Sequence, residues 1–280
     1  MKKNSKLLIV LGSSVVLVAV VLAALWLTLW AQPGVQDYQA AHKTAHTAET
    51  SYPAIKKTFT AYIGSLPALY KKGFTPEDVD AFSKKDREAF NGAVRTHTEN
   101  VKAIENEKAL RDDEFKRLYD TYAEKELANV EYLASYASAN TLYSSATNYT
   151  CADIYTASRG IETDDQKKFY EQYAANTISY AEDCLKDLKE LKSSTNKPFS
   201  VYGTAYEKMI NSRKTAVEQL ADGKLSQTQF AAASQKGIEK FEKATSVFIV
   251  AHKNALKTID DTSAADAFYA YTHKKSEGTK

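Results

Sequence analysis

Leu7 to Trp30 form an apolar run of 24 residues without a charge, and this run sets the first limit on the fold. A helix of that length would measure roughly 36 Å at about 1.5 Å per residue, which exceeds a hydrocarbon core of about 30 Å. Residues 1–30 are therefore predicted to form a cytoplasmic stub and a transmembrane signal-anchor helix that contacts the membrane through residues 7–30. Residues 31–280 are predicted to form an extracytoplasmic α-helical domain.

Charges on either side of the run predict its orientation. Lys2, Lys3 and Lys6 precede it, whereas the first charge after it is Asp37. Because positive charge is retained in the cytoplasm, the chain is expected to be a single-pass protein of the cell membrane with its N-terminus inside and its C-terminal domain outside. A cleaved signal peptide is the alternative, but its apolar stretch is usually about 7 to 15 residues and ends in a small-x-small site, where this chain has Leu29.

The remaining 250 residues carry the pattern of packed helices. Only 10 Gly and 5 Pro occur in the chain, which is little punctuation for a sandwich or a barrel. Apolar residues instead recur at alternating steps of three and four, as on a helix that packs against other helices. The fold class is predicted to be all-α, with a bundle of about six helices. The first such seam contains Tyr38, Ala41, Ala45, Ala48, Tyr52, Ile55, Phe59, Tyr62 and Leu66.

Helix boundaries can be predicted from capping residues. Gly73 to Pro76 predict the end of one segment and the start of another, and Thr163 with Gln166 predicts a capping box. Gly223 followed by Ser226 and Gln229 predicts a second box. Pro53 lies inside the first seam, where we expect a kink or a restarted helix.

Charge and motifs exclude several classes of function. Without the three lysines before the apolar run, 34 basic residues face 35 acidic ones, interspersed along the chain, so no nucleic acid is expected as a partner. The sequence contains no nucleophile elbow, Walker loop, zinc-protease pair or dinucleotide fingerprint. The protein is therefore not expected to be an enzyme, although a hydrolase whose residues assemble only in space stays open. The acidic pairs, such as Asp112-Asp113, suit helix termini better than catalysis.

Cys151 and Cys184 are the only two cysteines. An even number in an oxidising compartment favours a disulfide, which in the chain-entropy model would contribute about 3 to 4 kcal/mol. The alternative is a pair of buried thiols, since Cys184 shares a helical face with Ala181 and Leu188.

His42, His46 and Glu49 are the candidate metal ligands. They lie at positions i, i+4 and i+7 of the first predicted helix and share a face, so one further donor would complete a site for zinc or copper. The alternative is a solvated flank of the Ala41, Ala45 and Ala48 seam. His97 is predicted to be a core or boundary residue, and His252 and His273 are expected to have no ligand-type neighbours.

Two functions follow from these features. The first is a membrane-anchored extracytoplasmic interaction or scaffold protein that binds a protein partner on the cell surface. The second is a metal- or small-ligand-binding surface protein that uses His42, His46 and Glu49.

Overall fold

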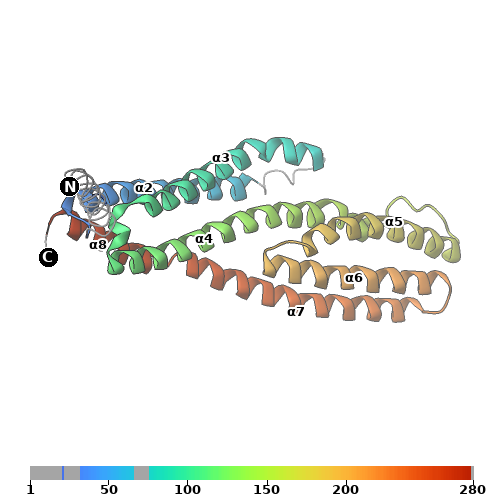
Figure 1. Ribbon diagram of the computed structural model, residues 1–280. Helices are drawn as coiled ribbons and strands as arrows, with labels where there is room; N and C mark the ends of the chain where they lie inside the picture. Colours follow the sequence, from blue (N-terminus) through green and yellow to red (C-terminus); the bar gives the residue numbers. More distant parts are fainter. Residues whose placement is uncertain (1–20, 22–31, 66–75, 279–280) are drawn as a thin grey trace, which may run out of the picture. The chain divides into compact units, whose positions relative to one another are not determined.

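The computed structural model describes residues 21, 32–65 and 76–278 (Figure 1). In those residues the chain forms seven α-helices and no strand, so the predicted all-α class is confirmed. The α-helices are α2 (Val35–Ser65), α3 (Pro76–Ala103), α4 (Asp113–Ser145), α5 (Gln166–Lys192), α6 (Lys197–Ala221), α7 (Gln227–Ile259) and α8 (Ser263–Ser276). Short 3-10 helices cover Ile104–Asn106, Lys108–Arg111 and Asp153–Thr156, and a π-helical turn covers Ala146–Thr150.

No helix in the described part of the chain is both long and apolar enough to cross a membrane. The predicted transmembrane segment, residues 7–30, lies outside the described residues except for Val21. The anchor and its orientation therefore stay predictions.

Polar side chains cap the starts of α4, α5 and α7, with one correction to the predicted caps. Asp165, and not Thr163, caps α5, because its carboxylate accepts from the backbone N–H groups of Lys167 and Lys168. Thr163 accepts from the backbone N–H of Asp165, one step before the helix. A carboxylate next to the free amides competes successfully with a hydroxyl two residues earlier, since it carries the full charge that the helix dipole favours.

The other predicted boundaries fit the observed helices. Ser226 and Gln229 form the expected reciprocal box, with N···O distances of 2.8 and 3.2 Å. Gly223 ends the preceding turn with φ 72°, a left-handed conformation that favours glycine. α3 begins at Pro76 as predicted, although residues 73–75 lie outside the described part. Pro53 does not restart α2, which is one helix with the proline inside it.

The described chain divides into two compact units. The first contains described residues up to 48, together with 100–123 and 264–278. Its core is built around Phe268 of α8, whose ring lies 5.4 Å from that of Phe115 and 5.0 Å from that of Tyr122. Ala41 and Ala45 of α2 are fully buried, as the seam predicts. Large aromatic rings and small alanines thus pack together in the core of this unit.

The second unit contains residues 49–99 and 124–263. In it α6 packs against α5 on one side and α7 on another. Aromatic rings from α6 and α7 meet in the core, with Tyr206 and Phe241 4.8 Å apart and Phe199 and Phe248 4.9 Å apart. This packing holds α6 and α7 side by side over much of their length (Figure 1).

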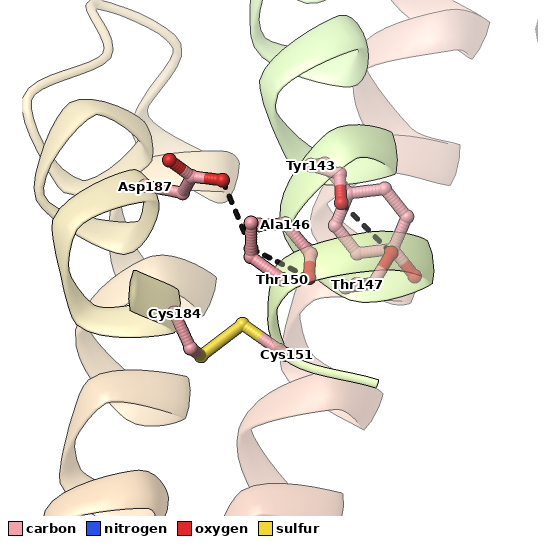
Figure 2. Close-up of a disulfide and its surroundings, with 7 residues drawn as sticks. All are labelled: Tyr143, Ala146, Thr147, Thr150, Cys151, Cys184 and Asp187. Atoms are coloured by element: carbon pink, nitrogen blue, oxygen red, sulfur yellow. Dashed lines mark hydrogen bonds between the residues drawn. A yellow bond between two sulfur atoms is a disulfide. The ribbon is translucent and has the colours of Figure 1, made fainter. Parts of the chain in front are cut away.

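The predicted disulfide is present in the second unit. Cys151 and Cys184 are bonded, with an S–S distance of 2.08 Å, and both are fully buried. Figure 2 shows the bond between α5 and the turn that follows α4, with Thr150 donating a hydrogen bond of 2.9 Å to Asp187 beside it. The covalent bond and this hydrogen bond fix the irregular segment after α4 to the C-terminal third of α5.

Candidate binding groove

A groove with a volume of about 820 Å³ runs along the surface between α6 and α7. Its lining includes the small residues Ala205 of α6 and Ala233 and Gly237 of α7, together with the unbranched side chain of Met209. The full lining is Lys197, Ser200, Val201, Thr204, Ala205, Lys208, Met209, Ser212, Ala233, Lys236, Gly237 and Lys240.

Gly237 sets the depth of this groove. A Cβ atom at Gly237 would lie 3.7 Å from the hydroxyl of Ser212 and 3.9 Å from Cγ of Met209. The two helices therefore approach closely at this point, in a contact that leaves room for a methyl group and little more. Short side chains here keep the space above the contact open.

Four lysines line the groove, two on each helix. The described residues of the lining include no Asp or Glu. All four are exposed: Lys197, Lys208, Lys236 and Lys240. None of them pairs with a described acidic residue. Nearby lysines differ, since Lys192 binds Glu207 at 2.9 Å and Lys214 binds Glu182 at 3.1 Å. These four lysines thus place positive charge without a described acidic partner on both sides of the groove.

The predicted metal ligands lie elsewhere, on α2. His46 and Glu49 are exposed and His42 is half-buried, as on the flank of a packed face. Nδ1 of His42 lies 3.3 Å from the hydroxyl of Thr272, and its ring lies 5.3 Å from that of His273. His273 therefore does have a ligand-type neighbour, contrary to the expectation from sequence, because α8 brings it next to α2.

No three His, Cys, Asp or Glu side chains in the described ranges are placed to hold a metal ion. The rings of His42 and His46 are 6.4 Å apart and oriented as a stack. Ligation by all three predicted residues would need their side chains to turn from these positions, so the metal site stays a prediction.

A hydroxyl, an imidazole and a carboxylate do assemble in space in the second unit. Ser51 Oγ lies 2.8 Å from Nδ1 of His97, and Nε2 of His97 lies 2.9 Å from Oε1 of Glu126. This is the order of groups in an activated serine. A hydrolase also needs donors for an oxyanion, and Ser51 lies inside α2, whose backbone N–H groups are used by the helix. The network satisfies both ring nitrogens of His97, which is fully buried as predicted.

A second polar cluster, in the first unit, is centred on Asp112. Its carboxylate accepts hydrogen bonds from the hydroxyls of Tyr38 and Tyr271 and from two backbone N–H groups at the start of α4. Lys275 Nζ lies 3.6 Å away. Partial burial would raise the pKa of Asp112, but the hydrogen bonds outweigh it and lower the pKa. Burial, and then the Asp112 carboxylate, raise the pKa of Tyr38.

The Asp112 cluster stabilises the contact between helices of the first unit. All the acceptor capacity of the carboxylate faces groups of its own unit, and it joins α2, α4 and α8. The role expected for the Asp112-Asp113 pair, at a helix terminus, is confirmed for Asp112. The groove differs, since its charges have no partner in the described chain.

The groove could not be predicted from the sequence. The net charge of the domain is close to zero, and this balance does not reveal that four lysines meet at one place on the surface. The usable signal was the run of α7 from Ala233 to Lys240, in which two lysines share a face with Ala233 and Gly237. The two lysines of α6 are eleven residues apart and show no motif on their own. Their placement opposite α7 depends on the tertiary contact.

Comparison with models of known protein families, with curated protein sequences and with solved structures found no match. The chemistry of the groove is thus the basis on which a function can be inferred.

Proposed function

We propose that this chain is a membrane-anchored, extracytoplasmic interaction module that binds a protein partner on the cell surface in the groove between α6 and α7. Residues 7–30 would hold it in the cell membrane, with its N-terminus in the cytoplasm. The observation that carries the proposal is the set of four lysines around the groove without a described acidic partner.

Such an arrangement has a cost that binding would relieve. Lys236 and Lys240 are four residues apart on one helix face, where like charges destabilise the helix by a few tenths of a kcal/mol. Lys208 adds a like charge from the facing wall. A negatively charged ligand would offset this repulsion, and its attraction to the lysines would contribute to the free energy of binding. The same attraction favours both the approach and the orientation of an anionic partner.

Acylation of lysines on intact cells tests the location and the occupied face together. A membrane-impermeant amine reagent should label Lys168, an exposed lysine of α5 outside the groove, equally on cells and in the purified full chain. Lys208 and Lys240 should be labelled severalfold less on cells than in the purified chain, because the partner covers them. Absence of labelling at Lys168 on cells would contradict the orientation, and equal labelling of all three lysines would contradict the groove as the binding site.

Binding of zinc or copper by His42, His46 and Glu49 is the second candidate function. The contact between His42 and His273 favours it, because a third imidazole lies near the predicted ligands. Imidazole and carboxylate are suitable ligands for both ions. The ion would have to draw the side chains together from their observed positions.

A further inference from the structure

We infer that the occupant of the groove is a helix of the partner protein, amphipathic and acidic along both edges. This inference rests on the proposed function and specifies the chemistry of the partner. Its evidence is the length of the groove, the size of the side chains in its lining and the distribution of charge on its walls.

The groove is long enough to bind a helix of about four turns. On α6 its lining extends from Lys197 to Ser212, which is roughly 22 Å at about 1.5 Å per residue, or four helical turns. Helices pack with axes about 8–10 Å apart, and the shortest separations need small side chains at the contact. Ala205 and Ala233 provide such side chains on the two sides of the groove, and Gly237 is already packed against Ser212 and Met209 of α6.

Another face of α6 already packs closely against a helix, α5, at a small residue. Gly203, on another face of α6, is buried, and a Cβ atom there would lie 3.1 Å from the backbone nitrogen of Lys192 and 3.3 Å from Cγ of Leu191. Glycine thus allows α5 to approach α6 closely. The groove between α6 and α7 also contains small residues, Ala205 and Ala233, and no described helix covers it.

Exposed apolar side chains are present on both helices that form the groove. Val201 of α6 lines the groove and is 40% exposed, whereas Met209, also in the lining, is only 7% exposed. On α7, Val247 follows Lys240 by seven residues, which places it on the same side of the helix, and it is 61% exposed. A stripe of apolar residues on a docked helix would cover these side chains and remove them from water.

The lysines determine the charge of that helix. Because they stand on both walls, an occupant with its acidic residues on both edges of an apolar stripe can pair with them as the flanking positions of a coiled coil do. A lipid headgroup gathers its charge at one end and leaves the opposite wall unpaired. A flexible polyanion could reach both walls, but it would not cover the exposed side chain of Val201.

A designed peptide tests the inference with the full-length chain in detergent. The probe is a helix of about 20 residues with Leu and Ala along one stripe and Glu at the flanking positions, and its control has Gln in place of each Glu. The acidic peptide should bind at least tenfold more tightly than the Gln peptide at low salt, with the difference shrinking as salt rises. Fluorescence anisotropy of the labelled peptide measures both affinities.

Charge reversal locates the binding site. Lys208→Glu with Lys240→Glu should weaken binding of the acidic peptide at least tenfold. The same double variant should gain affinity for a peptide with Lys at the flanking positions, which the wild-type chain should not bind. Lys168→Glu with Lys189→Glu makes the same change in net charge on α5 and should leave both affinities unchanged. Ala205→Trp, which fills the groove without altering charge, should also abolish binding.

Other results overturn the inference. Binding to phosphatidylglycerol vesicles or to polyphosphate without binding to the acidic peptide would identify a lipid or a polymer as the occupant. Equal binding of the acidic and Gln peptides would exclude charge recognition. If no probe binds while Lys208 and Lys240 are still protected on cells, the helical occupant is wrong and the proposed function stands. If that protection is also absent, the proposed function fails with it.

Discussion

Removal of the Asp112 carboxylate should destabilise the first unit more than any other single polar substitution in it. Asp112→Ala deletes the acceptor for two N-terminal amides of α4 and for the hydroxyls of Tyr38 and Tyr271. Loss of a helix cap costs about 1 kcal/mol. A hydrogen bond to a charged group contributes about 1.5 to 3 kcal/mol when buried, and the Asp112 side chain is 16% exposed. Taking the lower end for the two phenols gives a total loss of about 4 kcal/mol.

The effect should depend on pH in a defined direction. The pKa of Asp112 is lowered in the folded protein, so its stabilisation is fully present above the unfolded value near 4 and is lost as pH falls through the folded pKa. Asp112→Asn keeps a good cap and a neutral acceptor and should lose only part of the stability at pH 7.

Urea unfolding followed by circular dichroism at pH 7 and pH 2.5 measures these differences, and hydrogen exchange of α8 reports them locally. The ranking at pH 7 should be wild type, Asp112→Asn, then Asp112→Ala, with smaller gaps at pH 2.5. A loss below about 1 kcal/mol for Asp112→Ala at pH 7 would refute the reasoning, because loss of the cap alone should cost about that much. An equal loss at both pH values would show that the carboxylate charge has no part in the cluster.

Three further predictions concern other parts of the chain. Replacing Cys151 and Cys184 together by Ser should lower the free energy of unfolding by about 3 to 4 kcal/mol, since the bond closes a loop with a sequence separation of 33; an unchanged urea midpoint would contradict this. Gly203→Ala should destabilise by about 1 to 3 kcal/mol because backbone atoms lie within 3.4 Å of the new methyl group, whereas Gly237→Ala, with contacts of 3.7 Å or more, should be neutral or stabilising by up to about 1 kcal/mol in the same melts. If the metal site exists, calorimetry should show saturable zinc binding near pH 7 that weakens below about pH 6.5, and His46→Ala should remove it with less than about 0.5 kcal/mol change in stability; absence of heat in the parent protein would eliminate the site.

Local patterns were sufficient to predict most helices and some of their ends. The alternation of Tyr38, Ala41 and Ala45 reports a buried face because it depends on one helix alone. The start of α7 could likewise be predicted locally, because the capping box of Ser226 and Gln229 lies within four consecutive residues. α8 was missed because it is only 14 residues long and its aromatic residues are not arranged in one clear stripe. Asp261, whose carboxylate accepts from the backbone N–H of Ser263, was the available signal for its start.

Contacts between distant segments were beyond the reach of sequence. His97 could be placed in the core by its spacing from Ala93 and Val101, but its partners Ser51 and Glu126 are 46 and 29 residues away. The groove is of the same kind, since each wall looks like an ordinary solvated helix face until the other is set beside it. Only the disulfide was an exception, because the chain offers a single possible pair.

Site-specific photo-crosslinking on intact cells tests the central claim, that the groove between α6 and α7 is the surface where a partner binds. A crosslinking side chain at Val201, inside the groove, should give a discrete product, and the same group at Glu190, on the exposed side of α5, should give none. Lys208→Glu with Lys240→Glu should abolish the product at Val201, while Lys168→Glu with Lys189→Glu should leave it unchanged. A product that survives the groove reversal, or one formed equally at both positions, would contradict the account.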